Sequence, residues 1–442
     1  MNDVRSRRSP IARTSLALTV GRVVSGVVAM LAAVLVARAA GASALGVFGL
    51  ALTAGAYATT IADAGVSQYL LPELGRAPRH EWPVLWADAF RLAVRSTVPL
   101  VLVYAILVLL LTHGDQRLAL LAAALWWVAL RASGYTRPFF IAAERVGIEA
   151  TATVGEGVVA LVAIFALMQV SRSPALAMLG LALGALVGLA ARLAGLKRLG
   201  ITGGKATRQG WELTRAATPF AAVLILTALY LRIDVFLLSA LRTSREVGLY
   251  QPPVRIVTAL LILPDALAAV LLVRSSRSPA HHAIKRRQET LLSISVPLGL
   301  LLVGVCAVAG KPLLALTFGP EFRQAGPALA LLAATVPLAL LTVMNGNALT
   351  VRGLVWTRVL CLFAASVCAI GLGIPAIAYF GYVGAAAVSI VNELVLVIAY
   401  GIALRRLCGR DSLILPRLHL PHGSLFRRTT PPASAWPGAC DS

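Results

Sequence analysis

An apolar segment that carries two opposite charges is the first place where this sequence could do chemistry. The stretch LTALYLRIDVFLLSAL, residues 226–241, holds Arg232 and Asp234 among hydrophobic side chains. If the segment crosses a bilayer, each charge costs about 2.5–3.5 kcal/mol near the helix centre. Residues two apart on a helix do not face each other, so the two charges are not simply each other's salt bridge. Each charge therefore needs another residue, water or a ligand as its partner.

Three arginines in apolar segments are candidate anion-binding residues, namely Arg22, Arg232 and Arg255. A guanidinium group is always protonated and can bind a phosphate through two parallel hydrogen bonds. Intramembrane charges usually face a bundle interior or a water-filled cavity, where such binding takes place. The alternative is that these arginines pair with carboxylates elsewhere or extend toward the membrane surface.

Five carboxylates in the apolar segments are candidates for ion coupling or gating: Asp63, Glu156, Asp234, Asp265 and Glu393. A buried carboxylate can alternate between a protonated and an ion-bound state. The alternative is that these groups pair with the arginines or cap helix ends. Asp63 and Asp265 lie about 17 residues into their predicted helices, where a structural or gating role is at least as well supported.

The composition requires a membrane protein to position these charges. Of the 442 residues, 59% are hydrophobic and only 13% are charged, and the mean hydropathy is +0.84. A soluble chain has about 25% charged residues, so too few polar side chains remain here to cover a large soluble core. The net charge of +22 does not indicate nucleic-acid binding, because the basic residues lie in short clusters between apolar runs. The five cysteines show no metal-binding spacing, and no metal, cofactor or cleavable signal peptide is expected.

Twelve segments are long and apolar enough to cross a bilayer, which takes about 20 residues each. The sequence therefore predicts an all-α, polytopic membrane protein. One of the segments carries Arg131, and Pro337 interrupts another. A stripe of Gly180, Gly184 and Gly188 at four-residue spacing predicts a close helix-packing face. The predicted segments are approximately 14–37, 46–71, 92–112, 118–139, 147–169, 174–196, 214–240, 247–273, 290–309, 325–350, 354–380 and 382–404.

The loops between these segments predict the topology. With a cytoplasmic N-terminus, most of the 40 basic residues fall in the inside segments, and Arg137 and Arg192 are counted among them. Basic residues concentrate on the cytoplasmic side of membrane proteins. We therefore expect both chain ends to be cytoplasmic, in a bacterial inner (plasma) membrane.

An internal repeat relates the two halves of the chain. When the sequence is shifted by 202 residues, LVARAAGASALGVFG lies over LLSALRTSREVGLYQ, with Gly46 over Gly248 and Asp63 over Asp265. Six predicted helices separate the copies, so the two halves have the same orientation, as in a parallel repeat. The expected organisation is a basic cytoplasmic N-terminus, a six-helix bundle, a cytoplasmic linker, a second six-helix bundle and a disordered cytoplasmic tail, at 1–13, 14–200, 201–213, 214–406 and 407–442.

Several stretches carry a family resemblance that covers about residues 14–406. The N-terminal one is GRVVSGVVAMLAAVLVARAAGASALGVFGLALTAGAYATTIADAGVSQYLLPELGR, and the central one is RIDVFLLSALRTSREVGLYQPPVRIVTALLILPDAL. They resemble the signatures of Wzx-like polysaccharide biosynthesis flippases, members of the multidrug/oligosaccharidyl-lipid/polysaccharide (MOP) exporter superfamily. FGPEFRQAGPALALLAATVPL and YFGYVGAAAVSIVNELVLVIAY are similar to later segments of that family.

The resemblance implies a fold like that of MATE transporters and MurJ, with two six-helix bundles around a central cavity that opens to each side in turn. It implies transport of an undecaprenyl-pyrophosphate-linked oligosaccharide from the inner to the outer leaflet. Arg22, Arg232 and Arg255 would then receive the pyrophosphate, and a proton or sodium ion would couple at the carboxylates. The partners that it suggests are membrane lipids and a polysaccharide polymerase or glycosyltransferases.

Three other classes of function stay open at this point. A drug or cation antiporter of the same superfamily, a lipid II flippase and a non-transporting membrane scaffold all fit the same helix pattern. A membrane polymerase or ligase is the closest enzymatic alternative, but it would need a large outer loop, and every predicted outer loop is short. The sequence has no HExxH, Walker or GxSxG motif, so we expect no enzymatic activity.

Overall fold

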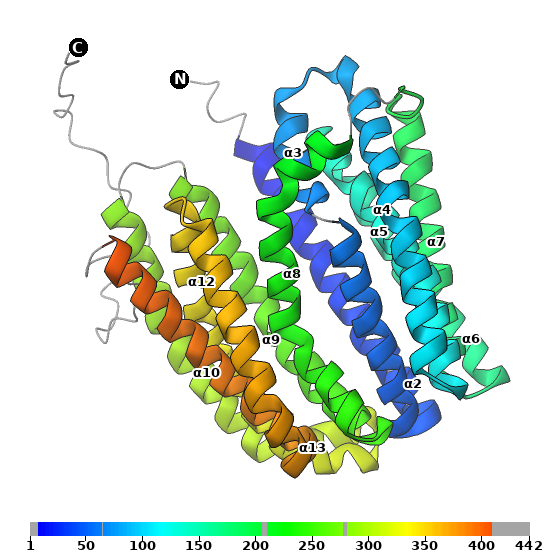
Figure 1. Ribbon diagram of the computed structural model, residues 1–442, viewed down its shortest axis with the longest axis vertical. Coiled ribbons are helices and arrows are strands. Elements are labelled where there is room, and N and C mark those ends of the chain that lie inside the picture. The colour runs from blue at the N-terminus through cyan, green and yellow to red at the C-terminus, as the bar shows by residue number, and fades with distance from the viewer. Residues whose placement is uncertain (1–7, 64, 206–209, 277–280, 409–442) are drawn as a thin grey trace.

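The described part of the chain is entirely helical. The computed structural model describes residues 8–63, 65–205, 210–276 and 281–408, and no strand occurs within these ranges (Figure 1). The elements are α2 (Arg8–Asp63), α3 (Val66–Arg76), η1 (Arg79–Glu81), α4 (Trp82–Leu111), α5 (Gly114–Ala142), α6 (Val146–Val170), α7 (Pro174–Arg198), α8 (Gly210–Leu241), α9 (Ser244–Ser276), α10 (His281–Phe318), η2 (Pro320–Ala325), α11 (Gly326–Ala333), α12 (Thr335–Val351) and α13 (Val355–Cys408).

The all-α membrane fold is confirmed, whereas the count of twelve spans stays a prediction. In the described ranges, nine helical stretches are long and apolar enough to cross a membrane. Two of them each include most of two predicted spans. α2 turns at Gly41 (φ 79°) and α13 turns at Gly381 (φ 57°), and a positive φ of this kind costs a glycine little.

Some predicted boundaries were wrong, and local backbone chemistry explains two of the differences. The predicted span 46–71 is broken, because α2 ends at Asp63 and Gly65 adopts a left-handed conformation before α3. The predicted span 325–350 is divided between α11 and α12, three residues before Pro337, which has no N–H for the helix ladder. α4 begins at Trp82, ten residues earlier than predicted.

Large apolar side chains cover the outside of the helices. Val170 and Val308 are 82% and 85% exposed, and long apolar rows of this kind run along α4, α6, α10 and α13. Such a surface would aggregate in water, but it is suited to contact with lipid tails. The protein is therefore a multi-pass membrane protein.

In Figure 1, α2 and α4–α7 gather on one side, while α9, α10, α12 and α13 gather on the other, with α8 between them. On the first side, the glycine stripe of α7 packs against α6, as the sequence predicts. A Cβ atom on Gly184 would lie 2.5 Å from the carbonyl oxygen of Glu156, and one on Gly180 would lie 2.7 Å from the backbone nitrogen of Ile164.

The repeat-related glycines meet where α2 crosses α9. A Cβ atom on Gly46 would lie 1.8 Å from the carbonyl oxygen of Ser244, and one on Gly248 would lie 1.8 Å from that of Ala42. Only glycine allows the two backbones to approach this closely. Because Gly46 and Gly248 correspond through the repeat, a two-fold axis passing between them accounts for this reciprocal contact.

Two further contacts across the molecule come from side chains on α2. The Tyr57 hydroxyl donates to the carbonyl oxygen of Ala228 on α8 at 2.8 Å. The Arg38 Nε donates to the carbonyl oxygen of Thr317 at the end of α10 at 2.9 Å. These are few and polar, and hydrogen bonds of this kind contribute only about 0.5–1.5 kcal/mol each.

Candidate functional site

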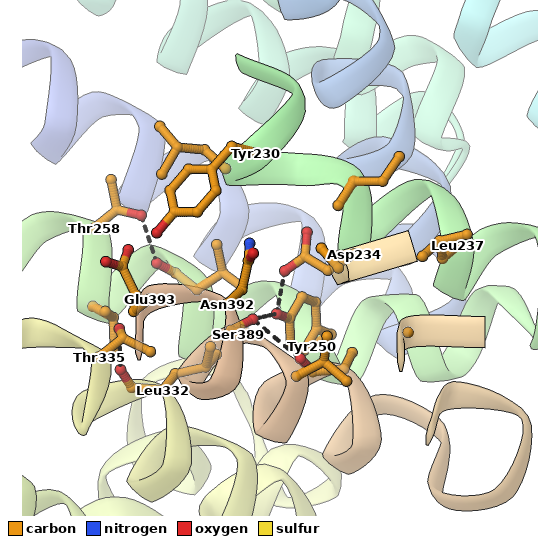
Figure 2. Close-up of a pocket in the computed structure, with 18 of the residues that line it drawn as sticks. Tyr230, Asp234, Leu237, Tyr250, Thr258, Leu332, Thr335, Ser389, Asn392 and Glu393 are labelled. Carbon is orange, nitrogen blue, oxygen red and sulfur yellow. Dashed lines mark hydrogen bonds between the residues drawn. The ribbon is translucent and has the colours of Figure 1, made fainter. Parts of the chain in front are cut away.

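A small cavity in the second half of the chain brings together two of the predicted carboxylates. It measures about 120 Å³ and is lined by residues of α8, α9, α11, α12 and α13. Asp234 projects into it from α8 and Glu393 from α13, together with Ser389, Asn392 and Thr335 (Figure 2). We call it the carboxylate cavity.

Asp234 is held by a tyrosine and by its own helix. The Tyr250 hydroxyl of α9 donates to the Asp234 Oδ2, and the backbone N–H of Val235 donates to the Oδ1 at 2.8 Å. The same phenol oxygen lies 3.4 Å from the Ser389 Oγ on α13 (Figure 2). Three helices therefore meet at the Asp234 carboxylate. Within the described ranges, Arg232 forms no hydrogen bond or ion pair with it, as the two-residue spacing predicts, although its charge acts on the carboxylate.

Glu393 is buried, with 8% of its surface exposed, and hydroxyl groups surround it. The Thr342 hydroxyl donates to its Oε2 at 2.8 Å, and the Tyr230 phenol faces the same carboxylate. The neighbouring Asn392 keeps its buried Oδ1 without a hydrogen bond. Among the described residues, neither Glu393 nor Asp234 forms an ion pair with a basic side chain. The cavity thus offers two carboxylates and several neutral oxygens, the ligand set that hard cations prefer.

A larger cavity lies within the first half of the chain. It measures about 440 Å³, is lined by residues of α2, α5, α6 and α7, and includes Arg137, Glu156 and Arg192. We call it the arginine cavity. Unlike the carboxylate cavity, its wall carries charges of both signs.

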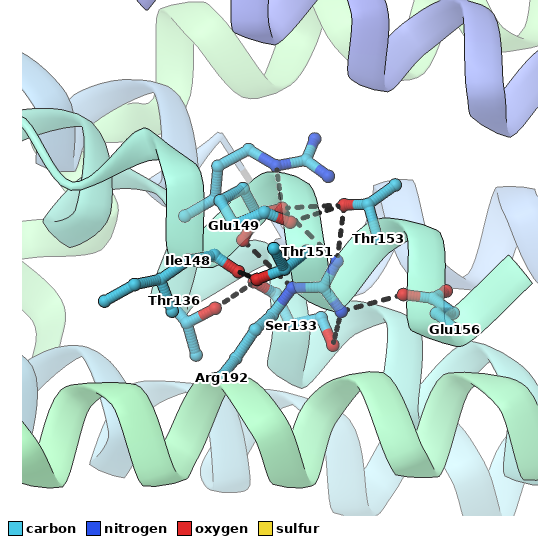
Figure 3. Close-up of polar contacts among 9 residues, drawn as sticks. Ser133, Thr136, Ile148, Glu149, Thr151, Thr153, Glu156 and Arg192 are labelled. Carbon is cyan, nitrogen blue, oxygen red and sulfur yellow. Dashed lines mark hydrogen bonds and ion pairs between the residues drawn. The ribbon is translucent and has the colours of Figure 1, made fainter.

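Arg192 is the centre of a hydrogen-bonded network beside this cavity (Figure 3). It is only 2% exposed, and its Nε lies 3.0 Å from the Glu149 Oε2. Its Nη1 lies 2.7 Å from the Glu156 Oε2, and its Nη2 donates to the Thr153 hydroxyl at 3.0 Å. A buried arginine is tolerated where geometry of this kind compensates for its lost hydration.

Arg137 extends the network from α5. Its Nε lies 3.0 Å from the Glu149 Oε1, so Glu149 binds Arg192 through both carboxylate oxygens and Arg137 through its Oε1. Two arginines and two glutamates therefore balance one another. Arg137 is half-exposed, and its two Nη atoms have no hydrogen bond to any described residue.

Arg255 joins the two halves of the chain. Its Nη1 donates to the carbonyl oxygen of Ala29 on α2 at 3.3 Å, while its buried Nε has no partner. Arg232 lies close enough for its positive charge to act on Arg255. Within the described ranges, neither arginine has a carboxylate partner within ion-pair distance. The side chains of Arg22 on α2 and Asp265 on α9, which are also predicted site residues, lie outside the described residues.

Asp63 stands apart from the other carboxylates, at the break between α2 and α3. It accepts a hydrogen bond from the Ser67 hydroxyl across the break. The buried Arg131 of α5 binds the adjacent carbonyl oxygen of Ala62, and also the Ser96 hydroxyl at 2.6 Å. The structure therefore brings Asp234 and Glu393 together, but leaves Asp63 and Glu156 at two separate places.

A family model described as polysaccharide biosynthesis protein matches residues 11–277, which is more than half of the chain. The chain belongs to the polysaccharide biosynthesis protein family. A comparison with curated protein sequences found no match. The predicted resemblance to this family is thereby confirmed.

Solved structures of transporters share the fold. "Lipid II flippase MurJ, inward closed conformation" aligns with a TM-score of 0.72 at 12% identity, covering 89% of this chain and 87% of that chain. An inward-facing multidrug resistance MATE transporter of the MOP superfamily aligns with a TM-score of 0.68 at 13% identity, covering 86% and 93%. A MOP superfamily transporter from Pyrococcus furiosus aligns with a TM-score of 0.65 at 14% identity, covering 91% and 95%. The chain therefore shares the fold of MurJ and of MOP superfamily transporters.

Membership of this family does not explain the arginine network, which was not predicted from the sequence. Arg137 and Arg192 were counted only among the basic residues of the inside segments, whereas the structure places both in one ion-pair network and buries Arg192. The spacing of Glu149 and Glu156 in the sequence could have indicated this network. They are seven residues apart and so share one face of α6, where two acids in an apolar helix need basic partners.

Proposed function

We propose that this protein transports an oligosaccharide linked to undecaprenyl pyrophosphate from the cytoplasmic to the outer leaflet, for cell-surface polysaccharide biosynthesis. Transport proceeds by alternating access between two six-helix bundles, residues 14–200 and 214–406, around a central cavity. Both chain ends are cytoplasmic, in the inner (plasma) membrane of a bacterium. The protein is not an enzyme, and it works beside the polymerase or glycosyltransferases that make and use the glycan.

The observation that carries this proposal is that Arg255, between α9 and α2, has no carboxylate partner among the described residues and binds only the carbonyl oxygen of Ala29 there. Its Nε is buried without a partner, and the like charge of Arg232 lies near it. Removing one partner from a buried charge is costly, so an arginine without a carboxylate gains most from an anionic ligand. A diphosphate fits a pair of guanidinium groups well, because each binds phosphate oxygens through two donors. Arg22 on α2 is the third donor of this proposed site.

The carboxylate cavity is the proposed site of the coupling ion. Asp234 and Glu393 hold a proton or a sodium ion there, surrounded by hydroxyl groups and the free Asn392 oxygen. Asp63 and Asp265, at corresponding places in the two halves, serve gating rather than ion binding. Glu156 is part of the arginine network, and its proposed role in coupling is the weakest of the five because Arg192 already neutralises it.

Substitution of the three arginines tests the proposal in cells that depend on this protein for surface polysaccharide. We expect Arg232→Ala with Arg255→Ala, and more strongly with Arg22→Ala added, to abolish the polysaccharide while the protein level is unchanged. The matched control is Arg245→Ala, an exposed arginine in the first turns of α9. Normal polysaccharide from the triple variant would contradict the proposal and favour a scaffold.

The carboxylate cavity also favours a second candidate, an antiporter of cationic drugs, because its acids have no basic partner among the described residues. An antiporter would lower the sensitivity of cells to cationic compounds, and the triple arginine variant would keep that activity. A lipid II flippase would instead be required for peptidoglycan synthesis. Growth, drug sensitivity and surface polysaccharide, measured in one deletion strain, separate the three.

A further inference from the structure

The arginine cavity has a composition that the proposed diphosphate site does not need. Its charges are balanced, with Arg137 and Arg192 facing Glu149 and Glu156. A diphosphate or a metal cation would gain little net attraction from such a neutral group. A ligand without charge, which can both donate and accept hydrogen bonds, gains more.

Donors and acceptors remain free beside this network. The Nη atoms of Arg137 are four N–H donors without a partner among the described residues. The Glu156 Oε1 has no hydrogen bond there either, since only its Oε2 binds Arg192. The Ser133 and Thr153 hydroxyls, which already accept from Arg192, line the same cavity. Sugar hydroxyls are both donors and acceptors, so they match a wall on which the two alternate.

An aromatic ring completes the wall of the cavity. Trp126 of α5 lines it, and a Cβ atom on Gly55 would lie 2.9 Å from the Trp126 Cζ3. The backbone of α2 therefore supports the indole on one side. An aromatic face gives apolar contact to the C–H face of a sugar ring, in addition to the polar groups that orient its hydroxyls.

The location of the cavity agrees with its chemistry. Ala29 and Ser25 of α2 form part of its wall, and the carbonyl oxygen of Ala29 is the one that Arg255 binds. A diphosphate at Arg255 would thus lie next to the cavity. In the cargo, the first sugar is bonded directly to the diphosphate, so the two binding sites must adjoin. The volume of about 440 Å³ falls within the range of about 300–1,000 Å³ that is usual for ligand pockets.

We propose that the arginine cavity binds the first sugars of the cargo, with Trp126 stacking on a ring and Arg137 and Glu156 binding hydroxyl groups. This inference rests on the proposed function and assigns a glycan subsite within it. Glu149 and Arg192 are positioning residues, because they hold Arg137 and Glu156 and do not themselves need to touch the sugar.

The test compares two lipids on the purified full-length protein. The probes are undecaprenyl pyrophosphate without a sugar and the lipid-linked oligosaccharide pool extracted from cells that make this protein. Binding is measured by native mass spectrometry with titration of each lipid. We expect Trp126→Ala and Arg137→Gln each to weaken binding of the glycan-bearing lipid about three- to tenfold, with binding of the bare lipid unchanged. Trp126→Phe keeps an aromatic ring and should retain most of the affinity.

Arg145→Gln is the matched control, because it removes the same charge from an exposed position outside the cavity and should change neither lipid. Equal losses for both lipids, at an unchanged melting temperature, would overturn the subsite and place the diphosphate in the cavity. No loss for either lipid would also overturn it. If the wild-type protein binds neither lipid, the proposed function itself fails, a result distinct from failure of the subsite alone.

Discussion

Glu156 and Glu393 are both carboxylates on membrane helices, yet the groups that bind them differ in charge. Glu156 lies 2.7 Å from the Arg192 guanidinium, which also binds Glu149. Glu393 accepts from the Thr342 hydroxyl and has no basic partner in the described part of the chain. The first carboxylate belongs to a neutralised network, whereas the second gains from any cation that reaches it.

The comparison shows that the same residue type supports two different kinds of site in the two halves. A charge with its partner already in place contributes to structure and can orient neutral ligands. A charge with only hydroxyl neighbours has no counter-charge, and such a site is suited to binding an exchangeable ion. The sequence repeat therefore fixes the helix arrangement of the two halves, but not the chemistry inside them.

The largest expected effect comes from removing the centre of the arginine network. Arg192→Met leaves Glu149 and Glu156 without their main partner, and breaking a buried ion pair in this way costs about 3–5 kcal/mol of unfolding free energy. The measurement is the melting temperature of the purified protein in detergent. Arg198→Met is the control, since this arginine is exposed in the last turn of the same helix. Equal melting temperatures for the two variants would contradict the structural role of Arg192.

A smaller effect is expected at Glu156, and it tests the comparison directly. Glu156→Gln removes one charge-assisted hydrogen bond but leaves Arg192 bound to Glu149, which should cost about 1–3 kcal/mol. The same change at Glu393 removes no ion pair and should cost less. The two variants are compared by thermal unfolding in one detergent. A greater loss of stability for Glu393→Gln than for Glu156→Gln would contradict the assignment of the ion pair to Glu156.

The loss of stability expected from Tyr250→Phe is smaller again. It removes the phenol that binds Asp234 and leaves that carboxylate with its backbone donor, at a cost of about 1–2 kcal/mol. Tyr379→Phe, at an exposed tyrosine of α13, is the matched control with no expected change. Equal stability of both variants would show that the phenol is not needed to satisfy Asp234.

The smallest effect on stability, but the most specific one, is expected from neutral isosteres in the carboxylate cavity. Asp234→Asn with Glu393→Gln should change the unfolding free energy by less than about 1 kcal/mol, because no ion pair is broken. If the cavity binds sodium, the melting temperature of the wild-type protein rises when sodium chloride replaces choline chloride at constant ionic strength. The double variant should lose this rise. A variant that still responds like the wild type would exclude the cavity as the sodium site.

Much of the fold could be predicted from the sequence, and the reason is physical. Apolar runs must become helices in a bilayer, because lipid offers no partner to backbone N–H and C=O groups. The correspondence of Gly46 with Gly248 follows from a repeat in the amino-acid sequence. The breaks at Gly65 and Ala334 were missed, because the apolar character of the chain continues through them and only the backbone conformation changes.

The candidate site was predictable only in part. The cost of an intramembrane charge singled out Arg255, Asp234 and Glu393, but their partners lie on other helices, up to 226 positions away in the case of Ala29 and Arg255. No spacing within the sequence specifies such a contact. Arg192 is the clearest example. The sequence around a basic residue near the end of an apolar segment is the same whether its side chain contacts water or binds two glutamates.

Composition and apolar length were enough to determine an all-helical membrane fold, because the bilayer imposes these features on each segment separately. The tertiary structure alone decided which buried charges are neutralised and which still lack a counter-charge. That difference depends on distances of a few ångströms between side chains from different helices, and the strength of a charge pair in a medium of low dielectric constant changes steeply over such distances.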